Sequence, residues 1–207
     1  MSRIYVYKLV AVNGGAPCDQ EGLLSLAICK PAIRRCAAVG DLIFGFAGNT
    51  LYNDNRLIYA ARITEIVSGQ RYYGGPRHRN RRDCIYELVE TVYRRRVGAL
   101  YHDDPGALEH DLGAPPHYQN AVVPLSTDYR YFGTSGSFGY KIDFPRVRQS
   151  IESLGRGHRV NHGDDLQHEL LSLWGRLRRS DVPVMASEVP VINAEACNPP
   201  ARRDRRC

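Results

Sequence analysis

Residues Asp41–Gly48 read DLIFGFAG, which is a continuous apolar run. An apolar run of this length indicates a buried strand. A second run, Leu57–Val67, reads LIYAARITEIV and is rich in the β-branched residues that favour strands. Because only the polar loop Asn49–Arg56 separates the two runs, we expect them to pair and to place a sheet in the core.

Other segments also have the character of strands. Near the N-terminus, Ile4 and Val6 alternate with two tyrosines, which is the period of a strand. The segments expected to be strands are Arg3–Val12, Ala121–Ser126, Asp128–Gly133 and Val189–Ile192.

Four segments are expected to be helical. One begins with Pro31, because proline favours the first helical turn. Another begins at Asp83, a candidate N-cap followed by apolar residues at helical spacing. A third begins at Asp164, which forms a D-x-x-Q capping box with Gln167 and precedes a face of leucines and Trp174. The segments are Pro31–Val39, Asp83–Val97, Pro145–Leu154 and Asp164 to about Arg179.

The order of these elements indicates the fold class. Strands and helices follow one another without regular βαβ alternation, and no Gly-rich phosphate loop of Rossmann or P-loop spacing occurs. This pattern indicates an α+β domain built on a small curved β-sheet or barrel. We expect one domain over residues 1–180 and a C-terminal extension over residues 181–207 with a disordered basic tail.

The composition excludes several classes of protein. Of the 207 residues, 43% are hydrophobic and 24% are charged, which are ordinary globular values. No apolar run approaches the ~20 residues of a membrane span. The N-terminal segment also lacks the apolar core of a signal peptide. We therefore expect a cytoplasmic protein with no membrane partner.

The positive charge is arginine-rich and concentrated at one end. The net charge is +6, of which the tail Ala201–Cys207 contributes +3 through four Arg and one Asp. Only three of the 28 basic residues are lysine. Arginine suits bidentate phosphate contacts, but a GC-rich genome produces the same bias without any function. Both explanations stay open from composition alone.

The densest polar cluster covers residues 155–162, GRGHRVNH. His158 and His162 titrate near neutrality, and Arg159 offers a planar donor fork. Together with Asn161 they precede an expected helix N-terminus, where a phosphate or a base edge could bind. The alternative is a polar connector whose histidines cap the neighbouring helices.

Two further clusters have the composition of a base-binding surface. In the first, Lys30 and Arg34 precede a strand end in which glycines alternate with aromatic residues, including Phe46, up to Asn49. In the second, Arg130 and Tyr131 lie in an alternation of aromatic residues and arginine. Aromatic rings can stack on a base. The alternatives are a core strand whose glycines mark a bulge or close packing, and a half-buried strand with an exposed arginine.

Conventional catalytic motifs are absent from the sequence. No G-x-S-x-G elbow occurs, and the six cysteines form no CxxC pair of the kind that binds zinc. Cys18 is a possible nucleophile if a histidine lies beside it in space. A metal site is a further alternative, formed by loop residues among His102, Asp103, Asp104, His110, Asp111 and His117. We expect no metal and no cofactor.

Six segments carry a resemblance to a known family. They read YVYKLVAVNGGAPC, LLSLAICKPAIRRCAAVGDLIFGFAGN, RLIYAARITEI, DCIYELV, HDLG and GHRVNH. They resemble the nucleotide modification associated domain proteins, in particular the second numbered family, over about Arg3 to Trp174. The resemblance implies a bacterial or phage system that modifies or hypermodifies DNA bases, with other components of that system as partners.

A partial similarity points to a fold as well. The order of helix, Gly40-Asp41, apolar strand, loop and Leu57–Ile66 is similar to the EVE and YTH domains of the PUA-like superfamily. This similarity implies a small β-barrel that holds a modified base in an aromatic pocket. The chain departs from those domains because their pocket tryptophans have no counterpart, and Trp174 is expected in the core.

Three functions are consistent with the sequence. The favoured one is a DNA-binding reader of a modified base or nucleotide, since a base must leave the stack to be read. The second is an enzyme that makes or trims the modification, with His158 or His162 as acid–base. The third is a non-catalytic adaptor. For the reader, the expected base contacts are Lys30, Arg34, Phe46, Asn49, Arg130, Tyr131, Arg159 and Asn161, and the expected phosphate contacts are Arg77, Arg79, Arg81 and Arg82.

Overall fold

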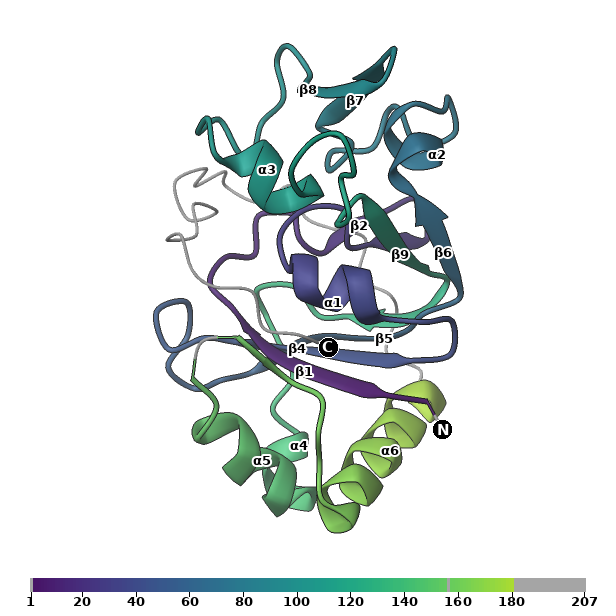
Figure 1. Cartoon of the computed structure of the whole chain (residues 1–207). Helices are drawn as coiled ribbons and strands as arrows, with labels where there is room; N and C mark the ends of the chain where they lie inside the picture. The colour runs from purple at the N-terminus through teal and green to yellow at the C-terminus, as the bar shows by residue number, and fades with distance from the viewer. Residues whose placement is uncertain (1, 156, 181–207) are drawn as a thin grey trace.

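The first apolar run and residues Leu57–Arg62 of the second form neighbouring strands of a five-stranded sheet in the computed structural model (Figure 1), which describes residues 2–155 and 157–180. β4 (Leu42–Ala47) runs antiparallel to β5 (Leu57–Arg62) and parallel to β1 (Ile4–Leu9). β10 (Asp128–Tyr131) and β11 (His158–Arg159) are the edge strands, so the order is β10-β5-β4-β1-β11. The predicted pairing is confirmed for Leu57–Arg62. The prediction of one strand over Leu57–Val67 is wrong, because Glu65–Ser68 form a strand of a second sheet.

A glycine within β4 makes room for an aromatic ring of the next strand. Gly45 lies opposite Tyr59, and a Cβ at Gly45 would overlap Cε1 of that ring. The register shifts between Gly45 and Phe46, which places an irregularity there. The glycine in this strand therefore marks close packing rather than an open wall for a ligand.

A second, four-stranded sheet and a hairpin account for the other strands of the described residues. The second sheet has the order β2-β3-β9-β6 and is formed by β2 (Cys18–Gln20), β3 (Leu23–Ser25), β9 (Val122–Ser126) and β6 (Glu65–Ser68). The hairpin consists of β7 (Tyr86–Val89) and β8 (Val92–Arg95). Because each sheet ends in edge strands that do not pair with one another, the described sheets are open. The α+β class is confirmed, and the barrel alternative is wrong.

Helices cover the five-stranded sheet on one face (Figure 1). They are α4 (Tyr140–Asp143), α5 (Pro145–Glu152) and α6 (Asp164–Arg179). α6 has the predicted bounds, and Trp174 is buried with Phe44 of β4, as expected. The other face packs against α1 (Pro31–Cys36) and carries a cluster of buried tyrosines: Tyr5, Tyr7, Tyr59, Tyr129 and Tyr131.

The remaining two helices belong to the upper part of the molecule in Figure 1, with the second sheet and the hairpin. α2 (Gly69–Tyr73) follows β6, and α3 (Ala107–Leu112) lies beside α1 and β8. None of the described helices has the length and apolar character needed to cross a bilayer.

The helix predicted over Asp83–Val97 is wrong, because this segment contains the β7–β8 hairpin. Its apolar residues fit a helical period, but they are mostly β-branched or aromatic. Tyr86 and Tyr93 both pack their rings edge-on against Tyr73 of α2, at centroid distances of 5.5 and 5.9 Å. Burial of these rings in the tertiary structure therefore overrides the local helical pattern.

Two expectations fall on residues that the structure does not describe. They are the strand Val189–Ile192 and the disordered tail within residues 181–207. Apart from the helix Asp83–Val97 and the divided strand Leu57–Val67, the other expected strands and helices are present. β1, β10, α1 and α5 end two or three residues earlier than predicted.

Candidate functional site

The turn between β3 and α1 holds a cysteine in an uncommon backbone conformation. Cys29 has φ 57° and Lys30 has φ 46°, so both lie in the left-handed region that non-glycine residues rarely adopt. Pro31 then begins α1. Strain of this kind, about 1–3 kcal/mol per residue, is concentrated at functional sites. A sharp strand-to-helix turn also exposes the nucleophile in known nucleophile elbows, which makes Cys29 a candidate reactive residue.

Cys29 contacts a histidine that is itself held by a carboxylate. The Sγ atom of Cys29 lies 3.3 Å from Nε2 of His102, and Nδ1 of His102 lies 2.6 Å from Oδ2 of Asp111. If the Nδ1–H donates to the carboxylate, Nε2 faces the thiol and can exchange a proton with it. A thiol, a base and an orienting acid at these distances form the arrangement of nucleophilic catalysis. We call these three residues the Cys29 triad.

Asp111 holds the cysteine backbone as well as the histidine. Its Oδ1 accepts a hydrogen bond from the backbone N–H of Cys29 at 2.8 Å, and its Oδ2 accepts one from the Tyr86 hydroxyl at 2.8 Å. Burial by itself would raise the pKa of this carboxyl, but His102, Arg34 and Tyr86 together lower it. Asp111 is therefore an anion that can stabilise a positive charge on His102.

The three triad residues differ in how far they are buried. The side chains of His102 and Asp111 are 1% and 0% exposed, whereas Cys29 is only partly buried. The acid and the base are thus desolvated and fixed, and Cys29 is the least buried residue of the three. Two of the residues considered for a metal site, His102 and Asp111, belong to this triad. Among the described residues, no three or more Cys, His, Asp or Glu side chains are arranged so that they could hold a metal ion.

The two predicted catalytic histidines lie elsewhere, beside strand β1. His158 is half-buried on β11 opposite Tyr7, and its ring lies 6.0 Å from the ring of Tyr5. Nε2 of His162 is 2.8 Å from the carbonyl oxygen of Ile4, where it can donate a hydrogen bond. Burial lowers the pKa of His162 and favours its neutral form.

The other two residues of that cluster have different surroundings. Arg159 is half-buried on β11 and donates to Oγ of Ser150 on α5 at 2.7 Å. Asn161 is exposed. The structure therefore brings His158, Arg159 and His162 to one edge of the sheet, and their role as a binding or catalytic site stays a prediction.

The predicted base contacts near β4 are dispersed. Nζ of Lys30 lies 4.8 Å above the ring of Tyr7, close to the Cys29 triad. Phe46 is fully buried on the opposite face against Tyr140, at a centroid distance of 5.0 Å. Asn49 is exposed and accepts a hydrogen bond from Lys8 at 3.2 Å. Arg34 is fully buried beside the triad.

The residues of the third predicted cluster also separate. Nε of Arg130 donates to the carbonyl of Leu177 at 3.0 Å, so this side chain satisfies the C-terminal end of α6. Tyr131 belongs to the buried tyrosine cluster and is 5% exposed. Burial raises the pKa of Tyr131, so its hydroxyl stays protonated.

The four predicted phosphate contacts differ in burial. Arg81 is buried, lies 3.6 Å from Asp83 and donates to the carbonyls of Cys18 and Leu23 at 3.0 Å. Its role there is to join β2, β3 and the loop before β7. Arg82 is half-buried. The two exposed members are Arg77 and Arg79, and Arg77 lies 3.5 Å from Glu65.

Two other thiols differ from Cys29 in their surroundings. Cys18, which the sequence suggested as a nucleophile, is buried, and burial raises its pKa to about 12. Burial also raises the pKa of Cys84, to about 11. Since the thiolate is the reactive form, both thiols are inert at neutral pH.

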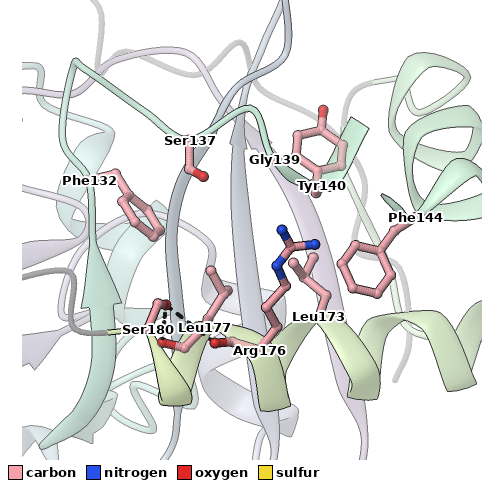
Figure 2. A pocket seen from close by; sticks show the side chains of 9 residues that line it. All are labelled: Phe132, Ser137, Gly139, Tyr140, Phe144, Leu173, Arg176, Leu177 and Ser180. Atoms are coloured by element: carbon pink, nitrogen blue, oxygen red, sulfur yellow. Dashed lines mark hydrogen bonds between the residues drawn. The ribbon is translucent and has the colours of Figure 1, made fainter. Parts of the chain in front are cut away.

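A small cavity lies on the α6 face of the five-stranded sheet (Figure 2). Phe132, Tyr140 and Phe144 form its aromatic wall, and Arg176 of α6 reaches between them. The cavity volume is about 130 Å³. This is smaller than the roughly 300–1,000 Å³ of typical ligand pockets, and its lining holds no cysteine, histidine or carboxylate among the described residues. The Cys29 triad is therefore the better candidate for chemistry.

The triad residues stand in separate parts of the sequence, and no local pattern connects them. Cys29 directly precedes Lys30 and Pro31, whereas the sequence indicates His102 and Asp111 as candidate metal ligands and places Asp111 in the HDLG segment of the family resemblance. They lie 73 and 82 residues after Cys29. No local motif spans such distances. The one local signal is that Cys29 lies two residues before the proline that begins α1.

Comparison with known proteins places the chain in a family. The family model described as nucleotide modification associated domain 2 matches residues 1–174, which include all three triad residues. No curated protein and no solved structure matches the chain.

Proposed function

Since the chain belongs to the nucleotide modification associated domain 2 family, we propose that it is a thiol-dependent enzyme of a nucleotide- or DNA-modification system. In this proposal Cys29 is the nucleophile, His102 is the general base and Asp111 orients the base. The observation that supports it most directly is the chain of contacts from Sγ through the imidazole to the carboxylate, at 3.3 and 2.6 Å.

The proposed reaction is acyl transfer through a thioester. Nε2 of His102 accepts the thiol proton as Sγ of Cys29 adds to an acyl carbon of the substrate. The tetrahedral adduct collapses when the leaving group takes that proton from Nε2 and departs, which leaves an acyl group on Cys29. Water or an amine then attacks the thioester, gives its proton to His102 and releases the product with the thiol restored. Asp111 stays ionised throughout and stabilises the imidazolium.

This chemistry narrows the class of substrate. Thiol–imidazole–carboxylate sets act on acyl carbons in unrelated folds. Membership of the nucleotide modification associated domain 2 family further suggests that the substrate contains a nucleotide. We therefore infer that the substrate is a nucleotide, or a base in DNA, that carries an amide or ester substituent. Other components of the modification system would supply or consume that substituent.

Recognition without turnover is the second candidate. It is favoured by His158 and Arg159, which place polar groups on an edge strand beside the ring of Tyr5. In this proposal His158, Arg159 and His162, at the β11 edge of the five-stranded sheet, bind a modified base. Arg77 and Arg79 contact the phosphates. An acid–base enzyme that uses His158 or His162, and an adaptor that binds no ligand, are the third and fourth candidates.

The experiment offers the protein nucleotides and short DNAs with amide- or ester-substituted bases, and unsubstituted counterparts. Mass spectrometry follows both the ligand and the intact protein. We expect a mass change in a substituted ligand, an acyl adduct on Cys29, and loss of both in Cys29→Ala. The control is His168→Gln, because His168 is exposed on α6.

Two results would decide against the enzyme. A ligand conversion that survives Cys29→Ala would exclude the thiol mechanism. A ligand that binds, returns with unchanged mass and loses affinity in Arg159→Ala would favour the reader.

A further inference from the structure

A buried arginine joins the two segments that supply the triad. Arg34 of α1 is fully buried, and its Nε donates to the carbonyl of Cys29 at 2.9 Å. Its terminal nitrogens donate to the carbonyls of Ala27 and Asp111. One guanidinium therefore connects the turn that carries the nucleophile to the helix that carries the acid.

The positive charge of Arg34 is balanced by the carboxylate of Asp111. The side chain bonds to backbone carbonyls, which satisfy its N–H groups but do not neutralise the cation. A buried charge is costly without an opposite charge nearby. The carboxylate of Asp111 supplies that charge, and Arg34 in turn favours its ionised form.

A tyrosine of the hairpin fixes the rotation of the carboxylate. The Tyr86 hydroxyl and Nδ1 of His102 both contact Oδ2 of Asp111, at 2.8 and 2.6 Å. The other oxygen, Oδ1, accepts the backbone N–H of Cys29. With both oxygens held, the carboxylate has one orientation toward the imidazole.

We propose that Arg34 and Tyr86 are positioning residues of the Cys29 triad, which hold the segment of Asp111 against the Cys29 turn and orient its carboxylate toward His102. This inference rests on the proposed function. It adds two residues that act through Asp111 and the backbone of the turn, and it makes the β7–β8 hairpin part of the site.

Several titratable groups face Asp111 from the elements around it. They are His102, Arg34, Tyr86, Tyr73 and His110. Tyr86 lowers the pKa of Asp111 through its hydrogen bond, and Arg34 lowers it through its charge. Removal of either interaction therefore raises the pH at which Asp111 takes up a proton.

The experiment measures alkylation of Cys29 by iodoacetamide from pH 4 to 9, with peptide mass spectrometry, and needs no substrate. The variants are Tyr86→Phe and Arg34→Lys. We expect Cys29 to react about tenfold more slowly at pH 7 in each, because a hydrogen bond to a charged group is lost or displaced. In both variants, the pH below which Cys29 alkylation slows should also be higher than in wild type. Cys18 and Cys84 serve as unreactive internal controls.

Tyr140→Phe is the matched control. Its hydroxyl also donates to a buried carbonyl, that of Asn55, but it lies on the opposite face of the sheet. Because distant sites act independently, the Cys29 rate in this variant should stay within about twofold of wild type.

Two outcomes separate this inference from the proposed function. If wild-type Cys29 reacts rapidly and both folded variants keep its rate and pH profile, the positioning roles are wrong and the triad stands. If wild-type Cys29 reacts no faster than an ordinary cysteine peptide, the triad itself is refuted. Should Arg34→Lys fail to fold, Tyr86→Phe decides by the same criterion.

Discussion

Two regions of the molecule place histidines beside strands, and they differ in what the imidazoles contact. In the triad region, the two ring nitrogens of His102 face a thiol and a carboxylate. In the edge region, His162 contacts the backbone carbonyl of Ile4, and His158 lies against the ring of Tyr5. The same residue type is thus built into a proton-transfer chain in one place and into a strand contact in the other.

The difference shows that density of polar residues in the sequence is a poor guide to a site. The edge region is contiguous, GRGHRVNH, and is conspicuous for that reason. The triad region comes from the β3–α1 turn, the loop after β8 and helix α3. Catalysis depends on which groups face each other, and that depends on tertiary contacts.

The largest expected effect breaks the triad. Cys29→Ala and His102→Gln should each reduce turnover of an acyl-substituted nucleotide by about 10³-fold or more, and the double variant should lose little further activity, because residues that act as one unit are non-additive. Single-turnover kinetics measures the rates. Independent, multiplying losses would show that the two residues do not act together.

Substitution of a histidine in the edge region should leave the turnover rate nearly unchanged. His158→Ala is expected to keep turnover within about twofold of wild type, because His158 is outside the Cys29–His102–Asp111 chain of contacts. The same kinetic assay tests this. A loss comparable to that of His102→Gln would reverse the assignment and favour the acid–base role predicted from the sequence.

Acid should affect the two regions in different pH windows. His162 has a lowered pKa, so the unfolded chain binds its proton more readily, and its contribution to stability is lost as the pH falls below about 6.5. Asp111 also has a lowered pKa, and its contribution is lost only as the pH falls below about 4. Thermal unfolding of wild type and His162→Gln between pH 5 and 8 tests the first window. Equal acid sensitivity of the two proteins would contradict it.

The smallest effect concerns Arg159. Arg159→Ala removes its hydrogen bond to Ser150, and we expect a loss of about 0.5–1.5 kcal/mol in the free energy of unfolding. The rate of Cys29 alkylation should not change. Urea unfolding with the alkylation assay measures both quantities. A slower Cys29 in this variant would mean that the two regions are coupled through β1.

The fold was predictable where local pattern and tertiary environment agree. The run Asp41–Gly48 is apolar on both faces, and both faces of β4 are in fact buried. Asp164 begins a helix whose apolar side packs on the sheet, as its periodicity indicated. The segment Asp83–Val97 was mispredicted because its period suits a helix, whereas Tyr86 and Tyr93 pack on Tyr73 as a hairpin.

Periodicity and motifs within short segments were sufficient to indicate five of the described strands, three of the described helices, the α+β class and the family resemblance. The strands are β1, β4, β5, β9 and β10, and the helices are α1, α5 and α6. Which polar residues form a site depends instead on tertiary contacts. His102 and Asp111 lie 73 and 82 residues from Cys29 along the chain, and Arg34 and Tyr86 join them from two further elements. Hydrogen bonds between residues so far apart in the sequence form only when the sheets and helices pack together. No local pattern of residues therefore encodes them.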